Sequence, residues 1–334
     1  MFSFISNFKR YKHVHSLSLM ILMGIICAMI CNAIIYKISI KNETSILEDV
    51  IFDDFFGRKC FPDSYPVVFY GDSRTFNCIS PKIVSEILQQ PSFNFAFSSG
   101  GLNEKMMKFI DSRIDKKNKA VIVLGITPYS LTEDARANES FNEYRDKFRN
   151  KGKNMLISPQ GPALYDIITM PTKRILSIGA THKGKIFKSK DYIKHYHDDG
   201  WVETIVTGDT SKSFKRTLEM YEKRNFQNNP ISKFSIDETL TYIRKWTEEG
   251  IIVLVFRPPT CEEMEEIEER KTKFSSFRLE DKVRENGGIY VNIPRSGWFS
   301  YDASHLDADS AKRLSEFIGN VILQHCCPVK ISEK

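Results

Sequence analysis

The chain has 334 residues, 41% of them hydrophobic, and a formal net charge of +6 at pH 7. This composition excludes a disordered or fibrous protein, and the length allows one elaborated domain or two small ones. The charge is mild and no stripe of Arg and Lys interleaved with aromatic residues occurs, so nucleic acid is not expected as a partner.

An apolar run covers residues 17–38, LSLMILMGIICAMICNAIIYKI, which is about the length that crosses a bilayer as a helix. Basic residues precede the run, and acidic residues dominate the segment after it. Because positively charged flanks stay in the cytoplasm, we expect a cytoplasmic basic segment (1–16), a transmembrane helix (17–38) and a polar stalk (39–60). The rest of the chain would then lie outside the cytoplasm, at the cell (inner) membrane.

A cleaved signal peptide and a lipoprotein signal are the alternatives for this segment. The run exceeds the apolar core of about 7–15 residues that is typical of signal peptides, and no small-x-small cleavage site comes after it. Cys27 and Cys31 are each preceded by isoleucine, where a lipoprotein signal would have a small residue. An uncleaved, single-pass anchor is therefore our interpretation.

The cysteine spacing does not suggest a zinc site, and one histidine pair leaves a metal as an alternative. The seven cysteines include no C-x-x-C pair, and single thiols are expected although a Cys60–Cys78 disulfide would suit an oxidising compartment. The alternate His195 and His197, followed by two aspartates, would share one face of a strand and could bind a metal. In a charged surface segment this pattern is usually incidental, so we predict no metal and no cofactor.

Short apolar runs alternate with amphipathic stretches from residue 61 to about residue 330, which we take as one domain. The runs typical of strands cover residues 66–71, 93–97, 120–125, 251–256 and 287–293. Helices are expected over about 80–89, 102–116, 234–249 and 261–286, and from Asp309 onward. This alternation predicts an α/β fold whose parallel sheet is covered on both faces.

Residues 129–230 interrupt the alternation and are interpreted as an insertion, because their apolar periodicity is weak. The interpretation that we favour is a solvated surface; the alternative is a cap that meets anionic headgroups or an anionic glycan. Basic residues gather here: Lys147, Arg149, Lys151, Lys153, Lys173, Arg174, Lys183, Lys185, Lys188 and Lys190.

Candidate catalytic residues follow the first and last expected strands. Ligands of an open parallel sheet bind outside the carboxyl ends of its strands. Ser73 follows the first strand, and Asp302 and His305 follow the last. A histidine that reaches a serine hydroxyl, with a carboxylate holding its other ring nitrogen, forms a nucleophilic triad. The order Ser, Asp, His therefore predicts serine chemistry at this edge.

Four blocks then resemble the SGNH (GDSL-type) hydrolase superfamily over roughly residues 65–325: GDSR, NFAFSSGG, VLGITP and DASH. The resemblance implies a flavodoxin-like three-layer sandwich, with Ser73 as nucleophile, His305 as base and Asp302 as its orienting partner. It also implies oxyanion donors at the backbone N–H groups of Ser73 and Gly100, with Ser99 as the alternative to Gly100.

The third block departs from the family pattern. The family usually has Gly-x-Asn-Asp, whose asparagine donates to the oxyanion, but this chain has Gly125-Ile126-Thr127-Pro128. Loss of one such donor costs about 3–4 kcal/mol of transition-state stabilisation. Arg257 and Arg74 are the candidate substitutes and the candidate substrate-binding residues, although each is more often a structural residue.

The departure and the predicted anchor make the chain resemble the membrane-anchored SGNH-like proteins of bacterial envelopes. That resemblance implies a serine esterase or O-acyltransferase acting on acyl esters, expected to be acetyl esters, of cell-envelope glycans. The implied partners are an acylated envelope polysaccharide or other acyl ester, a membrane-bound O-acyltransferase and the bilayer. The alternatives are a non-catalytic binding or scaffold protein and a lipid-directed esterase.

Overall fold

The computed structural model describes residues 18–31, 33–34, 45–117, 119–138, 145 and 186–326. The chain divides into two compact units: Met1–Phe52 with Gly152–Gly184, and Asp53–Lys151 with Lys185–Lys334. In the first unit, residues 18–31 and 33–34 are helical. The other residues of the expected 17–38 span, and the expected cytoplasmic segment 1–16, lie outside the described residues. Among the described residues, no helix has both the length and the apolar character needed to cross a membrane.

A five-stranded parallel sheet forms the centre of the second unit, as the alternation of elements predicts. Every residue of the two neighbouring central strands β1 and β3 is buried, which explains their continuous apolar sequence. In spatial order the strands are β2 (Ser92–Asn94), β1 (Val67–Gly71), β3 (Val121–Gly125), β7 (Ile252–Phe256) and β8 (Ile289–Val291).

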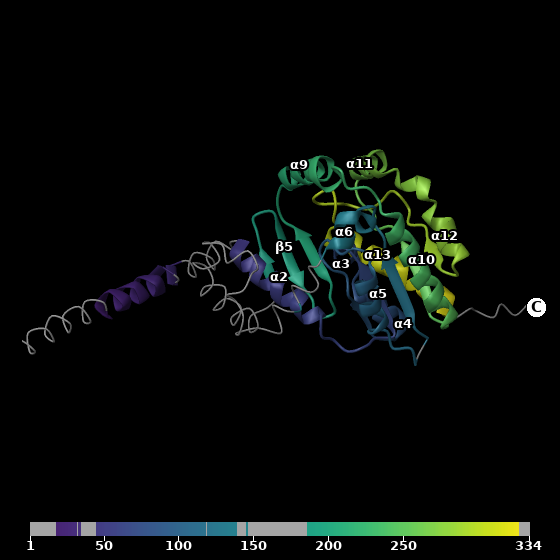
Figure 1. The fold of residues 1–334 in the computed structure, drawn as a ribbon, viewed down its shortest axis with the longest axis horizontal. Helices are drawn as coiled ribbons and strands as arrows, with labels where there is room; N and C mark the ends of the chain where they lie inside the picture. Colours follow the sequence, from purple (N-terminus) through teal and green to yellow (C-terminus); the bar gives the residue numbers. More distant parts are fainter. Residues whose placement is uncertain are drawn as a thin grey trace, which may run out of the picture. The chain divides into compact units, whose positions relative to one another are not determined.

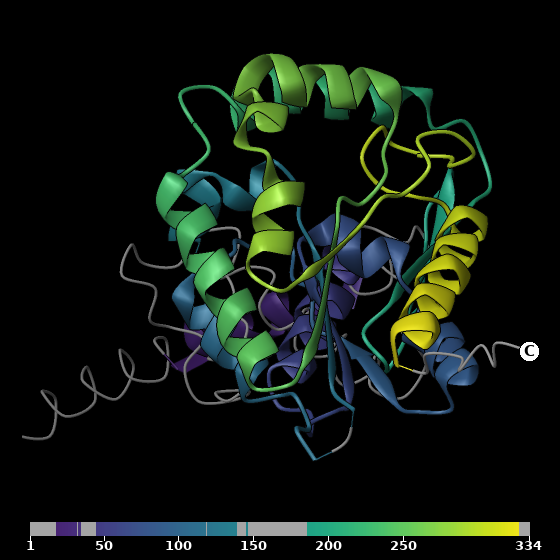
Figure 2. The same ribbon diagram turned by 90° about the vertical axis from the view of Figure 1, so that its right-hand side faces the viewer.

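Helices cover both faces of this sheet, an arrangement compatible with a three-layer sandwich. One face packs against the first set of helices, whose apolar side chains join those of the strands in a single core: α3 (Ser73–Cys78), α4 (Pro81–Leu88) and α13 (Ala308–Cys326). The opposite face carries the second set: α5 (Glu104–Asp111), α10 (Lys233–Glu248) and α12 (Leu279–Glu285). Figure 2 shows α13 in yellow on one side of the sheet and α10 in green on the other.

The single helix expected over 261–286 is two helices. Helix α11 (Glu262–Thr272) ends at Lys273, whose φ of +53° is left-handed, and α12 begins after Arg278, whose φ is +48°. The 3-10 turn η3 between them, Phe274–Phe277, buries the ring of Phe274. Neither proline nor glycine marks the break in the sequence, and charged residues continue on both sides of it. The sequence therefore indicates one long helix.

A helix occupies most of the segment expected to be a polar stalk. Helix α2 spans Ser45–Lys59, and within the second unit it buries the rings of Phe55 and Phe56 in edge-to-face contact with each other. The ammonium of Lys59 is also buried and donates to the carbonyl of Ala96 at 2.8 Å. Burial lowers the pKa of Lys59 well below its ordinary value. The aromatic residues of the segment therefore favour a packed helix over the polar stalk that its acidic residues indicate.

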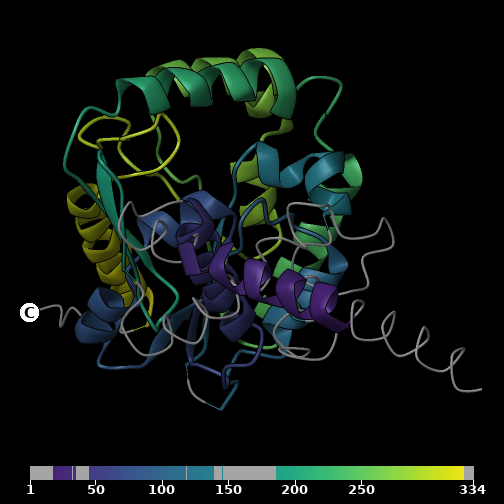
Figure 3. The same ribbon diagram turned by 90° about the vertical axis from the view of Figure 1, so that its left-hand side faces the viewer.

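The expected insertion at 129–230 is partly described, and its residues 139–144 and 146–185 lie outside the described residues. Of its basic residues named above, Lys188 and Lys190 fall within the described part and are exposed. Its described elements are η1 (Tyr129–Leu131), α6 (Glu133–Ala137), an antiparallel sheet of β4 (Ile186–Lys188), β5 (Tyr192–Tyr196) and β6 (Val202–Val206), α9 (Ser211–Met220) and the short π-helix η2 (Tyr221–Asn225). Figures 1 and 3 show α9 lying beside α11, which follows the carboxyl end of β7.

Candidate active site

Ser73 is the first residue of α3 and comes two residues after the end of β1. A Cβ atom on Gly71 or on Gly125, which ends the neighbouring strand, would lie 2.1 Å from the hydroxyl of Thr75. Glycine at both strand ends therefore lets α3 begin directly above the sheet. This close approach explains why an apolar strand runs straight into Gly-Asp-Ser-Arg.

Asp72 fixes the turn that presents Ser73. It is the N-cap of α3, where Oδ1 accepts the backbone N–H of Arg74 at 3.0 Å. Its Oδ2 accepts the hydroxyl of Thr127, which follows β3, at 2.5 Å. Burial raises the pKa of Asp72, and the neighbouring Arg74 and Thr127 oppose that effect. The ends of two adjacent strands are thus tied together beneath the serine.

His305 and Asp302 lie on the loop that leads into α13. Asp302 Oδ1 accepts the backbone N–H of Ser304 at 3.1 Å and that of His305 at 2.8 Å, which closes a tight turn. Ala303, inside this turn, has a φ of +68°. The turn brings Asp302 and its histidine onto the same side of the loop.

The three predicted triad residues lie in hydrogen-bonding sequence. Ser73 Oγ is 2.8 Å from His305 Nε2, and His305 Nδ1 is 2.9 Å from Asp302 Oδ2. Burial disfavours the charge of Asp302, but the His305 ring and the hydrogen bonds of the turn outweigh it and lower the pKa of the carboxyl. The side chains of His305 and Asp302 are 19% and 15% exposed, so solvent reaches both of them.

The groups that could donate to the oxyanion differ in whether each already donates a hydrogen bond to another acceptor. Among the described residues, the backbone N–H of Ser73 has no acceptor. The N–H of Gly100 donates to the carbonyl of Phe97 at 3.1 Å, within a turn. Thr127 stands where the family has asparagine, and its hydroxyl already donates a hydrogen bond to Asp72. One of the three donor positions is therefore available in this conformation.

Arg74, predicted as a substrate-binding residue, is buried beneath the site with 1% of its side chain exposed. Its Nε donates to Ser304 Oγ at 3.0 Å, and its guanidinium pairs with Glu268 of α11 at 2.7 Å. Burial opposes the charge of Arg74, but Glu268 more than offsets this and raises the pKa of the guanidinium. Arg74, the residue after the nucleophile, is thus hydrogen-bonded to Ser304, the residue before the base.

Arg257 pairs with the other oxygen of the same carboxylate, at 2.7 Å from Glu268 Oε2. The side chain of Arg257 is 24% exposed, whereas that of Glu268 is fully buried. Arg257 is therefore the arginine that solvent can reach, and its role as a substrate ligand stays a prediction.

Sequence reasoning missed two residues that support the site. The acidic run around Glu268 suggests a solvated helix face, although Glu268 lies four residues after the buried Met264 and next to the buried Ile267. That helical spacing is the signal that could have identified it. Asn77, one turn after Ser73, donates to the Ser73 carbonyl at 2.8 Å. Nothing in the sequence separates Asn77 from an ordinary helix residue.

Neither a protein-family model nor a curated protein matches the chain. Function must therefore be judged from the geometry of Ser73, His305 and Asp302. A serine, histidine and carboxylate at these separations can transfer a proton from the serine to the imidazole during nucleophilic attack.

Proposed function

We propose that the chain is an SGNH-like serine esterase or O-acyltransferase acting on acyl esters, acetyl esters in particular, of cell-envelope glycans. The observation that carries this proposal is the hydrogen-bonded series Ser73–His305–Asp302 at the carboxyl end of a parallel sheet. The four sequence blocks that resemble that superfamily support the proposal, although the sequence comparisons add no support.

In the proposed first half-reaction, Ser73 Oγ attacks the ester carbonyl while His305 Nε2 takes its proton. Asp302 accepts the Nδ1–H of His305 and stabilises the imidazolium that forms. The C–O bond of the ester then breaks, and the imidazolium gives its proton to the departing alcohol. The product is an acyl-serine and a free hydroxyl.

In the second half-reaction, His305 takes a proton from a second nucleophile, which attacks the acyl-serine. The bond between the acyl carbon and Ser73 Oγ then breaks, and the imidazolium returns its proton to Ser73 Oγ. Water yields a free acid and makes the protein an esterase, whereas a sugar hydroxyl yields a new ester and makes it an O-acyltransferase. The same three residues serve both outcomes, so the acceptor that occupies the site decides the product.

A specific observation favours a second candidate function, that of a non-catalytic binding or scaffold partner of an O-acyltransferase. The hydroxyl of Thr127 and the amide of Gly100 are both engaged, which leaves the Ser73 amide to stabilise the oxyanion. Each missing donor costs about 3–4 kcal/mol. A protein with this site would be a slow enzyme unless substrate binding releases the Gly100 amide.

We also propose that the second unit lies outside the cytoplasm, held at the inner membrane by the apolar N-terminal segment. The support is the charge asymmetry around residues 17–38 and the exposed apolar side chains of the helical residues 18–31. Protease added to intact spheroplasts should digest the chain beyond residue 60. Protection of that region would place it in the cytoplasm.

The function is tested by exposing the full chain, in detergent, to a fluorophosphonate and measuring intact mass. We expect one adduct, mapped by peptide analysis to Ser73, because only a serine activated by a base reacts with this reagent. Ser73→Ala and His305→Ala should abolish the adduct. Ser276→Ala, which alters an exposed serine on η3, is the matched control and should label like the wild type.

The two candidate functions give different results in this experiment. Folded protein that forms no adduct would exclude the activated serine and favour the scaffold. An adduct that persists in His305→Ala would contradict the role of His305 as base. Circular dichroism of each variant shows that the chain remains folded.

A further inference from the structure

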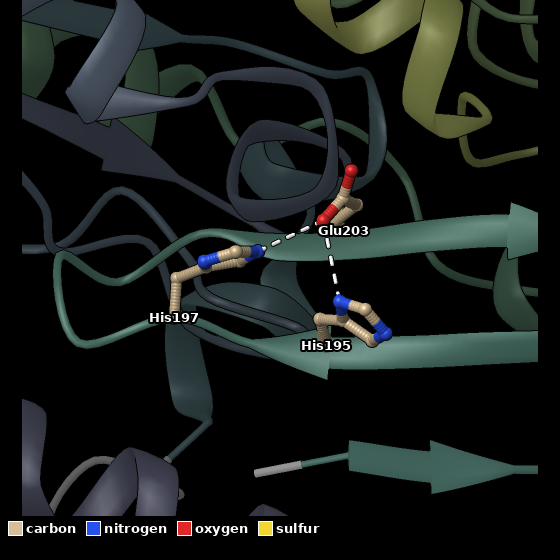
Figure 4. Close-up of side chains that lie close together, drawn as sticks. All are labelled: His195, His197 and Glu203. Atoms are coloured by element: carbon tan, nitrogen blue, oxygen red, sulfur yellow. Dashed lines mark hydrogen bonds and ion pairs between the residues drawn. The ribbon is translucent and has the colours of Figure 1, made fainter. Parts of the chain in front are cut away.

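A second polar cluster, outside the proposed active site, lies on the hairpin formed by β5 and β6. His195 and Glu203 face each other as cross-strand partners in the antiparallel register. His197 follows two residues after His195, so the pleat directs its side chain to the same face. Figure 4 shows both imidazoles directed toward the Glu203 carboxylate. Local strand geometry therefore brings the three side chains together.

One oxygen of Glu203 meets both imidazoles. Glu203 Oε2 lies 3.1 Å from His197 Nε2 and 3.5 Å from His195 Nδ1. The other oxygen, Oε1, is 2.7 Å from the ammonium of Lys312 on α13. Because Lys312 occupies Oε1, both imidazoles turn to Oε2, which is the carboxylate oxygen left to bind a cation together with them.

We propose that His195, His197 and Glu203 bind a divalent transition-metal ion of the Zn²⁺ class. Tetrahedral Zn²⁺ with bonds of about 2.0–2.1 Å places neighbouring ligand atoms about 3.3–3.4 Å apart. The two imidazole–carboxylate separations already bracket this value. The three ligand atoms lie within 4.8 Å of one another, so a small rotation of the His195 and His197 side chains completes the site.

Neighbouring side chains orient two of the three proposed ligands. The ring of His197 stacks on Trp201 with centroids 4.8 Å apart and planes 18° apart. Lys312 fixes the Glu203 carboxylate with Oε2 turned to the imidazoles. The side chain of Glu203 is 10% exposed and those of the histidines are 32% and 36% exposed. Three protein ligands at such a surface leave the fourth position to water.

The bound ion would stabilise the hairpin behind the proposed nucleophile. Trp201 Nε1 donates to the carbonyl of Asn77 at 3.0 Å, and Asn77 in turn holds the carbonyl of Ser73. A metal joining β5 to β6 therefore acts on an element that packs against α3. The metal proposal does not depend on the chemistry of Ser73, and each can fail without the other.

The test uses the untagged full chain in detergent, made metal-free with a chelator and titrated with Co²⁺. We expect one Co²⁺ per chain, with the intense visible d–d absorption of four-coordinate cobalt, and displacement by Zn²⁺. His195→Ala, His197→Ala and Glu203→Gln should each weaken binding at least about tenfold. His325→Ala, at an exposed position near the end of α13, is the matched control and should bind like the wild type.

Thermal unfolding gives a second readout with the same variants. Zn²⁺ should raise the unfolding temperature of the wild type but not that of His195→Ala/His197→Ala, because an ion that binds only the folded chain stabilises it. X-ray absorption at the zinc edge of the wild type should show nitrogen and oxygen ligands with imidazole scattering. Thiolate ligands, or Co²⁺ binding equal in the wild type and the double-histidine variant, would overturn the proposal.

Discussion

The central parallel sheet and the β5–β6 hairpin assemble their polar clusters in opposite ways. The proposed triad joins Ser73 to Asp302 and His305, more than 200 residues apart in the chain, at loops that follow the sheet. The hairpin cluster joins residues within eight positions of one another, on one face of two paired strands. The first cluster depends on long-range packing of the core, whereas the second depends on strand register.

The two regions are connected through α3. The backbone carbonyl of Asn77 accepts the indole N–H of Trp201, which lies in the hairpin. The side-chain amide of Asn77 donates to the Ser73 carbonyl. Changes at the triad should therefore remove activity and leave the hairpin intact, while changes in the hairpin should act on the triad weakly and through position.

The largest expected effect is on turnover of a small acetyl ester such as p-nitrophenyl acetate. Ser73→Ala and His305→Ala should each lower kcat on the order of 10⁴-fold, because either change removes the attacking unit. The double variant should lose no more than the single variants, since the two residues act together. Ser276→Ala is again the control. A Ser73→Ala protein with wild-type turnover would contradict the assignment.

The second effect is on stability, at the buried carboxylate beneath the triad. Glu268→Gln leaves Arg74 buried without its counterion and Arg257 without its partner. We expect the free energy of unfolding to fall by about 3–5 kcal/mol, measured by urea denaturation. Glu266→Gln, on the exposed side of α11, should change it by less than about 0.5 kcal/mol. Equal stability of the two variants would mean that the arginines find other partners.

The elements that can be predicted from sequence are those with one dominant physical signal. Strands β1, β3 and β7 have almost entirely buried residues and read as continuous apolar runs, so the sequence predicts them within a residue or two. Ser73, Asp302 and His305 can be placed together because strand ends meet at one edge of a parallel sheet.

The elements that cannot be predicted have competing signals. Helix α2 carries acidic residues that suggest a stalk, but its burial depends on aromatic partners distant in sequence, such as Phe76 and Phe97. The proposed ligand role of Glu203 depends on the β5–β6 register, which places Glu203, and not the nearby Asp198 or Asp199, opposite His195. The hydrogen bond from the Gly100 N–H to the Phe97 carbonyl depends on the geometry of a turn, which the identities of its residues do not determine.

A smaller effect is expected where the hairpin meets α3. Trp201→Phe keeps the apolar ring but removes the hydrogen bond to the Asn77 carbonyl. The loss should lower the free energy of unfolding by about 1 kcal/mol, and turnover should fall less than in any triad variant. Urea denaturation and ester kinetics measure the two effects. The matched control is Trp298→Phe, because the indole of Trp298 also donates to a backbone carbonyl but at a more exposed position.

The smallest effect is a change with pH in the stability that Asp302 contributes. Its pKa in the folded chain lies below the ordinary value of about 3.9. A lowered pKa means that the ionised carboxylate stabilises the fold fully above the unfolded pKa, and that this contribution is lost as pH falls through the folded pKa. Asp302→Asn removes the contribution at every pH. The difference in unfolding free energy between wild type and Asp302→Asn should therefore be largest near neutral pH and shrink below about pH 4.

Urea denaturation of the wild type and Asp302→Asn at neutral and acidic pH measures this difference, with Asp309→Asn, an exposed carboxylate in the first turn of α13, as the charge-matched control. A gap that widens as the pH falls would mean that the Asp302 carboxyl is stabilised in its protonated form. It would then be a hydrogen-bond donor to the loop, and His305 would lack the anionic partner that the proposed reaction requires.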